Sequence, residues 1–169
     1  KVIMAQNNQI CGIDLSKCSN VTMAAFNNNK LTRADLTNCI MLQSLWLNDN
    51  KLSSVIPPKK MPFLNVLNIA NNEFESFDFN LASSASEIVA NNNKLSGTVD
   101  LSKCYVLEKF FGSDNNIEKI EFSGSDLTTL IVNNNKLKVL DPKSSSIYWL
   151  EAKNNEITGV NVSYGDNLY

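Results

Sequence analysis

The sequence predicts a mainly β, or mixed α/β, solenoid: a right-handed superhelix of about eight coils with a parallel sheet along its concave face. Three observations lead to this prediction. An asparagine recurs every 20 to 22 residues, apolar residues recur at fixed distances from it, and no segment shows the helical periodicity of a long helix. The recurring asparagines are Asn8, Asn29, Asn50, Asn72, Asn93, Asn115, Asn135 and Asn155.

The clearest copy of the repeat runs from Leu42 to Leu52 and reads LQSLWLNDNKL. Apolar residues occupy the first, fourth, sixth and eleventh positions of this frame, and Asn50 occupies the ninth. This spacing is the leucine-rich repeat consensus. Alternate residues of its short strand point inward. Because one coil cannot bury that face alone, we expect the coils to stack around a shared core.

The ninth-position asparagine turns the chain out of the strand, where backbone N–H and C=O groups would otherwise be buried without partners. Its side-chain amide both donates and accepts hydrogen bonds, so stacked asparagines can satisfy the turn in coil after coil. We therefore expect the asparagine column to be structural, and neither catalytic nor ligand-binding.

The second half of each coil alternates apolar and acidic residues, which predicts a second short strand or an extended turn. We therefore expect a thin, mostly extended convex side with little helix. The third coil departs from the pattern and reads VIPPKK at residues 55–60. The segments that follow the pattern are Ile13–Ser16, Ala34–Thr37, Phe77–Phe79, Val99–Ser102, Ile120–Ser123, Leu140–Pro142 and Val160–Ser163.

The combined pattern resembles the leucine-rich repeats of bacterial surface proteins, in particular internalin-J-like repeats and their relatives in cell-surface proteins of Bacteroidetes. The segments that carry the resemblance are Asn29–Thr32 followed by Ala34–Thr37, and Asn93–Leu95 followed by Asp100–Lys103. The resemblance covers all eight coils. This chain differs from the internalin-J-like pattern in one respect: its coils lack the cysteine that internalin-J-like repeats carry in the first strand, where it stacks from coil to coil. The resemblance implies an extracellular location on a bacterial cell surface.

The unbroken repeat predicts a single leucine-rich repeat domain over residues 1–169. Lys1 occupies the second position of a coil, and Leu168 occupies the first position of an incomplete ninth coil. Neither end carries the capping helix or polar terminal repeat that solenoids normally need. We therefore expect both ends to be cut within a repeat or uncapped, which also leaves end-to-end self-association open.

Composition and charge argue against several classes of function. The chain has 15 basic and 17 acidic residues and a net charge of −2, without the basic field that a nucleic-acid or anionic-membrane partner requires. No run of about 18 apolar residues is present, so the sequence predicts no membrane-spanning segment. With no histidine, and hence no nucleophile–histidine pair, and no Gly-rich phosphate loop, we expect neither enzyme activity nor a cofactor.

Carboxylates recur on the convex side, where the frame aligns Asp14 with Asp35, and Glu121 with Asp100 and Asp141. A carboxylate pair could act in acid–base chemistry, and a column of oxygens could hold calcium. These residues follow the repeat frame instead of forming one cluster. We therefore expect each to accept backbone N–H groups of its own turn, and we expect no metal site.

Three of the four cysteines, Cys18, Cys39 and Cys104, lie four residues after the convex aspartate of their coil. Regular stacking places Cys18 about 4.8 Å from Cys39, within the roughly 4.4–6.8 Å Cα range of disulfides. A small buried thiol also suits a coil corner, so we favour free thiols and leave a Cys18–Cys39 disulfide as the alternative. Cys11 should be exposed or half-exposed. Without histidine or a C-x-x-C pair, zinc is not expected.

Binding, unlike catalysis, has a candidate surface. The fifth position of each coil points out of the sheet, and six of its eight residues are apolar. An exposed apolar strip with aromatic residues is typical of a protein-binding face. Val89 and Ile131 also suit the outside of any strand, whereas Trp46 is costly to leave in water. The candidate ligand-binding residues, from this column and its outward neighbours, are Met4, Met23, Trp46, Val66, Val89, Lys109, Phe111, Ile131, Tyr148 and Trp149.

The leading hypothesis is a non-catalytic recognition or adhesion module that binds a protein, such as a host surface protein, across the concave sheet. One alternative is a structural spacer or self-assembling repeat with no ligand of its own. Another is a glycan-binding module, because asparagines such as Asn27, Asn91 and Asn133 form an amide-rich rim. Turn preference explains the same asparagines without a ligand.

Overall fold

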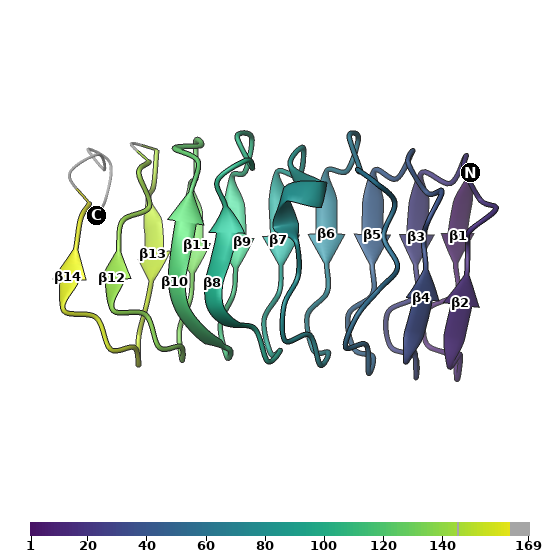
Figure 1. Ribbon diagram of the computed structural model, residues 1–169, viewed down its shortest axis with the longest axis horizontal. Coiled ribbons are helices and arrows are strands. Elements are labelled where there is room, and N and C mark those ends of the chain that lie inside the picture. The colour runs from purple at the N-terminus through teal and green to yellow at the C-terminus, as the bar shows by residue number, and fades with distance from the viewer. Residues whose placement is uncertain (145, 163–169) are drawn as a thin grey trace.

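A computed structural model describes residues 1–144 and 146–162. Within these residues the chain forms an eight-stranded parallel sheet in which neighbouring strands come from successive coils. Figure 1 shows these strands side by side along the long axis of the molecule. They are β1 (Val2–Met4), β3 (Met23–Ala25), β5 (Ser44–Trp46), β6 (Val66–Asn68), β7 (Glu87–Val89), β9 (Lys109–Phe111), β11 (Thr129–Ile131) and β13 (Trp149–Glu151).

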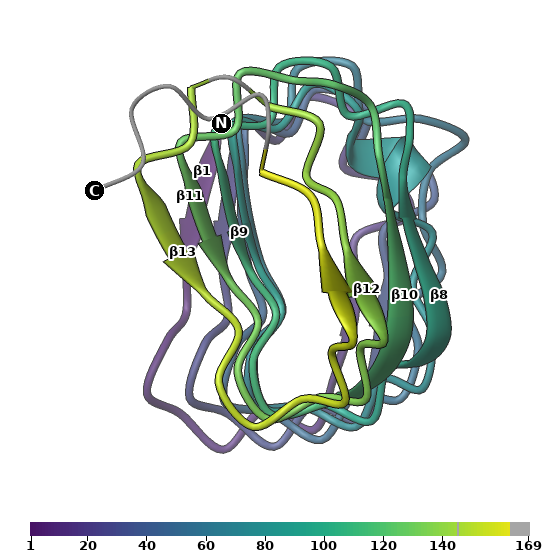
Figure 2. The same cartoon turned by 90° about the vertical axis from the view of Figure 1, so that its left-hand side faces the viewer.

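The core lies inside a tube of stacked coils, with the sheet on one side and the second half of each coil on the other (Figure 2). In the third coil the four apolar frame positions, Leu42, Leu45, Leu47 and Leu52, are at most 2% exposed. Fully burying one leucine side chain contributes roughly 1.5–3 kcal/mol. The predicted solenoid of about eight coils, with a parallel sheet and almost no helix, is confirmed.

The ninth-position asparagines link each coil to the one before it. The Oδ1 atom of Asn93 accepts the backbone N–H of Phe74 at 3.0 Å. Its Nδ2 atom donates to the backbone oxygens of Ile69, at 3.0 Å, and Ala90, at 3.3 Å. The corresponding asparagines from Asn29 to Asn155 make the same set of bonds. The expected structural role of the column is therefore confirmed.

Opposite the sheet, the described second halves of six coils form short strands that pair two by two. β2 pairs with β4, β8 with β10, and β12 with β14. Their bounds are β2 (Gly12–Asp14), β4 (Arg33–Asp35), β8 (Ser96–Leu101), β10 (Asn116–Phe122), β12 (Val139–Leu140) and β14 (Gly159–Val160). The thin, extended convex side is therefore confirmed.

Coils three and four interrupt these short strands. In the third coil, the proline-containing segment leaves only an isolated bridge between Ile56 and Asp35. The predicted strand or extended turn at Phe77–Phe79 is wrong at Phe79, where the 3₁₀ helix η1 (Phe79–Ala82) begins. Asp78 caps this helix, because its side chain accepts the backbone N–H of Asn80 at 3.1 Å.

The sixth position of the sixth coil is Gly112, where other coils carry an apolar side chain. The ring of Phe110 uses this space, since a Cβ atom on Gly112 would lie 2.6 Å from its Cε1 atom. Phe110 also meets the Phe79 ring edge to face, with centroids 6.0 Å apart. The glycine therefore allows one large ring to fill the core.

Two residues of the predicted C-terminal coils lie outside the described residues. They are Ser163, the end of the last convex segment, and Leu168, the start of the incomplete ninth coil. Across the described ranges, no helix is long and apolar enough to pass through a bilayer.

Candidate functional site

The candidate site is the sheet face, defined as the outward residues at the third and fifth positions of the coils together with Tyr148, which directly precedes the last strand of the sheet. Each strand of the sheet has three residues, and the middle one points into the core. In β5, for example, Leu45 is buried while Ser44 and Trp46 are partly exposed. The alternation follows from the pleat of a strand, in which successive side chains point to opposite sides.

The structure places the predicted residues on this face, but they do not form one continuous strip. Pairing in register puts Trp46 between Ala25 and Asn68. Ala25 is buried and small, and the side chain of Asn68 accepts the backbone N–H of Ala70 at 3.1 Å. Trp46 is thus separated from the next apolar residue of its column, Val89.

Five of the ten predicted residues come together in one shallow hollow of about 240 Å³. We call this the aromatic hollow, and its lining residues are Lys109, Phe111, Thr129, Ile131, Tyr148 and Trp149. They come from β9, from β11, and from the start of β13 with the residue before it. The other five predicted residues, Met4, Met23, Trp46, Val66 and Val89, lie elsewhere on the sheet face.

Thr129 was missed by the sequence reasoning. It pairs in register with Lys109 on one side and Trp149 on the other, so it occupies the same third position. The repeat frame therefore contained the signal for Thr129. A small threonine between two long side chains leaves the depression that forms the floor of the aromatic hollow.

A carboxylate at the edge of the hollow fixes one of its walls. The Trp149 indole N–H donates to Glu151 Oε1 at 2.9 Å. Glu151 Oε2 accepts from Asn133 Nδ2 at 2.9 Å and from Lys153 Nζ at 3.2 Å. These hydrogen bonds, of which the one from Asn133 has the largest effect, lower the pKa of Glu151 to about 2. Glu151 is therefore ionised at neutral pH and holds the Trp149 ring in one orientation.

Lys109 contributes a positive charge on the opposite side of the hollow. Its Nζ atom is 3.9 Å from Glu87 Oε2, and both side chains are partly exposed. Such an exposed pair is weak, typically below about 1 kcal/mol. The ammonium group can therefore turn toward a ligand at little cost.

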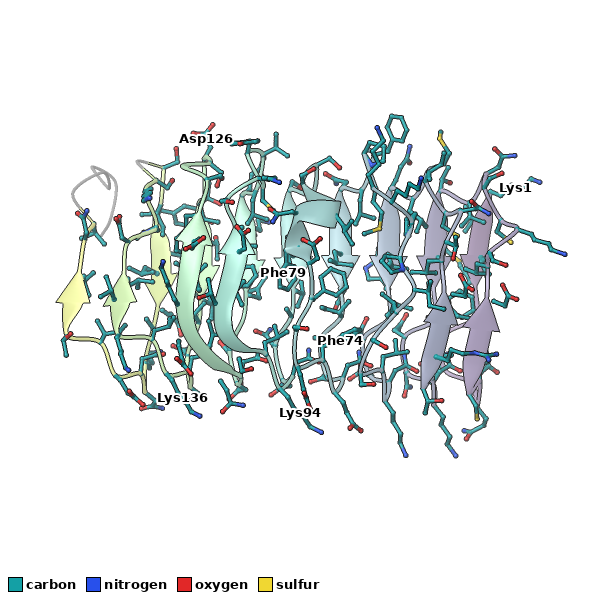
Figure 3. The ribbon with its side chains drawn as sticks, in the orientation of Figure 1. Lys1, Phe74, Phe79, Lys94, Asp126 and Lys136 are labelled. Atoms are coloured by element: carbon teal, nitrogen blue, oxygen red, sulfur yellow. The ribbon has the colours of Figure 1, made fainter. Side chains whose placement is uncertain are left out.

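The amide-rich rim at the strand ends serves the turns. The eighth-position residues adopt a left-handed backbone, with φ from +52° to +60°, which asparagine and aspartate tolerate better than most residues. Their side chains also bond along the rim: Asn28 donates to Asn7 at 2.8 Å, and Asn154 to Asn134 at 2.7 Å. Lys94 and Lys136 lie along the same long edge (Figure 3). The backbone of the eighth-position residues agrees with the turn role expected for them, whereas the seventh-position Asn91 and Asn133 accept the backbone N–H groups of Ser113 and Lys153 in the next coil.

The four cysteines are free thiols in the structure. Cys39 and Cys104 are buried, and burial raises the pKa of each thiol to about 11. Cys11 is exposed, as expected. Within the described ranges, no three His, Cys, Asp or Glu residues are grouped so that they could hold a metal ion.

The stacked coils and the parallel sheet give this chain the fold of a leucine-rich repeat solenoid. The family model described as Leucine Rich repeats (2 copies) matches residues 40–82. No curated protein matches the sequence.

Solved structures share the fold over nearly the whole chain. The functional domain of InlJ from Listeria monocytogenes, which includes a cysteine ladder, is 19% identical, with a TM-score of 0.66 over 99% of this chain and 47% of that one. A leucine-rich repeat protein of Leptospira interrogans is 20% identical, with a TM-score of 0.81 over 98% of this chain and 46% of that one.

A plant receptor has the same fold. It is the ectodomain of the membrane receptor kinase GASSHO1/SCHENGEN3 from Arabidopsis thaliana, solved in complex with CASPARIAN STRIP INTEGRITY FACTOR 2. It is 20% identical, with a TM-score of 0.76 over 95% of this chain and 24% of that one. The chain thus spans about half of the two bacterial structures and about a quarter of the plant ectodomain. At these identities the likeness shows the fold alone.

Proposed function

We propose that this chain is a non-catalytic recognition module that binds a protein ligand on its sheet face, at the surface of a bacterial cell. Solenoid repeats commonly provide extended surfaces for partner proteins. The observation that carries the proposal is the aromatic hollow, in which Phe111, Tyr148 and Trp149 surround one depression. Tyrosine and tryptophan are among the residues that contribute most to binding energy in protein interfaces.

The chemistry of the hollow suits a protein more than a small metabolite. It is shallow and open, with mostly apolar walls, a lysine on one side and an ionised glutamate beside Trp149 on the other. A side chain of a partner protein could insert between the rings while its polar neighbours reach Lys109 and Glu151. An apolar anchor with a polar rim is the usual organisation of a protein interface.

The proposed extracellular location draws support from the neighbours in fold. One is the functional domain of a Listeria protein, InlJ, and another is a receptor ectodomain bound to its partner. The Listeria structure also agrees with the resemblance of this repeat sequence to internalin-J-like repeats.

The test is a pull-down in which the immobilised chain is exposed to detergent-solubilised host surface proteins, followed by affinity measurement with the purified partner. The double variant Phe111→Ala with Trp149→Ala should weaken capture at least about a hundredfold, since two hot-spot residues cost about 2 kcal/mol or more each. Trp46→Ala with Phe111→Ala tests whether the ligand also spans the strands between them, about 14 Å.

Tyr105→Ala is the matched control, because Tyr105 is exposed but lies outside the sheet face. It should leave binding unchanged. Capture that survives the double change, in a chain that still melts as the wild type does, would refute the proposed site. Capture that soluble oligosaccharides abolish would favour the glycan alternative, and failure to capture any partner would favour the structural spacer.

A further inference from the structure

A second surface follows the long edge of the solenoid at which the chain passes from the convex side into the sheet. Each of the first five coils makes a four-residue turn there. In the third coil, for example, the backbone N–H of Leu64 donates to the oxygen of Met61 at 3.1 Å. Figure 3 shows Lys1 and Asp126 along this edge. We call it the turn edge, and its turns in the first five coils are residues 18–21, 39–42, 61–64, 82–85 and 104–107.

The two middle residues of each turn form its tip, and the tips differ between coils. In the first and fourth coils they are polar, Ser19–Asn20 and Ser83–Ser84, which is the usual composition of a turn. Three other coils carry apolar side chains at the tip, with exposed fractions between 36% and 68%. These side chains are Ile40, Met41, Phe63, Tyr105 and Val106. Because serine and asparagine make the same turn, the fold does not require apolar tips.

The apolar tips are held in a row by the stacking of the coils. Met41 and Phe63 occupy the same position in successive turns, and stacked strands are about 4.8 Å apart. In the fourth coil the Ser84 hydroxyl lies 2.9 Å from the backbone oxygen of Leu64, so it fixes the turn that carries Phe63. Val106 occupies the same position two coils further on, about 10 Å from Phe63 on strand spacing. The exposed apolar groups therefore project from ordered turns along one edge.

Lysines accompany these tips. In the third coil Lys59 and Lys60 directly precede the turn, and the convex segment of that coil carries no aspartate. The convex aspartates of other coils stand behind the edge and bond their own turns, as Asp100 does by accepting the N–H of Ser102 at 2.8 Å. Within the described residues, the exposed lysines of the turn edge are Lys1, Lys17, Lys59, Lys60, Lys103 and Lys143, and its exposed acidic residues are Glu108 and Asp126. The net charge of −2 for the whole chain does not describe this local positive excess.

We propose that the turn edge binds the surface of an anionic lipid bilayer, with the apolar tips inserted among the headgroups and the lysines at the lipid phosphates. Apolar area buried at the interface and the attraction of lysines to anionic lipids together give such binding its strength. A protein partner fits the edge less well, because lysine is depleted in protein interfaces. The serine tip of the fourth coil also interrupts the row, and a fluid bilayer can adapt to separate projecting side chains. No tip residue belongs to the sheet face, so this inference and the proposed function can fail independently.

Vesicle flotation tests the apolar tips. The chain should float with phosphatidylcholine vesicles that contain phosphatidylglycerol, float much less with phosphatidylcholine alone, and bind more weakly as salt is added. Met41→Ser with Phe63→Ser gives the second and third coils a serine in place of an apolar tip residue. This double change should weaken binding at least about tenfold. Val139→Ser removes an exposed apolar side chain from the convex side instead, and should bind as the wild type does.

A second pair of variants tests the charge. Lys59→Ala with Lys60→Ala should weaken binding to the phosphatidylglycerol vesicles at least about tenfold, since each lysine near an anionic surface contributes about fivefold. Lys94→Ala with Lys136→Ala removes the same charge from the opposite edge (Figure 3) and should bind nearly as the wild type does. All of these side chains are exposed, so every variant should melt as the wild type does.

Fluorescence locates the contact. The added indole of Phe63→Trp should emit at shorter wavelength on the vesicles and be quenched by brominated acyl chains, whereas Trp46 and Trp149 of the wild type should respond to neither. The proposal is overturned if the chain does not float with phosphatidylglycerol vesicles, if the double serine variant floats as the wild type does, or if the two lysine pairs have equal effects. Quenching of the wild-type tryptophans would place the sheet face at the bilayer and overturn it too. A protein ligand that slows hydrogen exchange at residues 39–42 and 61–64, in a chain that binds no vesicles, would assign the edge to a protein instead.

Discussion

Asn93 receives the backbone N–H of Phe74 from the preceding coil on its side-chain oxygen, at 3.0 Å. Both residues are buried, so water cannot replace the bond. The same amide donates to three backbone oxygens, that of Ile69 in the preceding coil and those of Ala90 and Asn91 in its own coil. One side chain therefore bonds four polar groups at the point where the chain leaves the strand.

Replacing Asn93 with alanine should lower the free energy of unfolding by about 2–4 kcal/mol, because one N–H and three C=O groups each lose a partner inside the protein. Urea unfolding followed by circular dichroism measures the loss. Asn20→Ala, on an exposed turn, is the control and should change stability by less than about 0.5 kcal/mol. Equal effects of the two changes would contradict the structural role of the asparagine column.

Gly112→Ala should destabilise the chain by about 1–3 kcal/mol through overpacking, since the new methyl group would meet the Phe110 ring at 2.6 Å. Thermal melting measures the effect. Gly159→Ala is the natural comparison, because a Cβ atom there meets nothing within 4 Å. That variant should melt at or slightly above the wild-type temperature. A Gly112→Ala chain as stable as Gly159→Ala would show that Phe110 does not need this space.

The pKa of Glu151, about 2, predicts how the aromatic hollow responds to acid. The pKa is lower in the folded chain than its ordinary value of about 4.3. The resulting stabilisation is therefore present above about pH 4.3 and is lost as the pH falls toward 2. The Trp149 indole N–H resonance, followed by NMR during titration, should shift with a midpoint near 2. Glu151→Gln should remove the transition, and a midpoint near 4 in the wild type would contradict the hydrogen-bonded arrangement.

Alkylation should separate the cysteines by burial. The pKa values of Cys39 and Cys104 are raised to about 11, so both thiols are protonated at neutral pH, and both are shielded from solvent. Cys11 is exposed. Iodoacetamide at pH 7.5 should modify Cys11 long before Cys39 or Cys104, as measured by peptide mass spectrometry. In urea the three should react at similar rates. Rapid modification of Cys104 in the folded chain would show that its corner of the coil opens.

The core could be predicted from the sequence because it follows the repeat frame. Leu45 and Leu67 occupy the same frame position in successive coils, and the structure pairs them in register. The asparagine ladder was predictable for the same reason. The start of η1 was not, since Asp78 can either continue an extended turn or cap a short helix, and the packing of Phe79 against Phe77 and Phe110 accompanies the second outcome.

The candidate site was predictable only in part. The outward direction of Phe111 and Ile131 follows from strand alternation, and both line the aromatic hollow. That Trp46 lies apart from them depends on the side chains between, namely Asn68 and Val89. The frame gives the direction of a side chain but not the size and bonding of its neighbours.

The sequence by itself determined the number of coils, their register, the buried face and the polar ladder, because each depends on a periodicity that every coil repeats. Only the tertiary structure decided where the coils differ: the hollow beside Trp149, and the exposed apolar tips of the turn edge at Met41 and Phe63. These features depend on contacts between particular side chains and on the backbone conformation of single residues. Such contacts form only when neighbouring coils stack, and a periodic pattern does not record them.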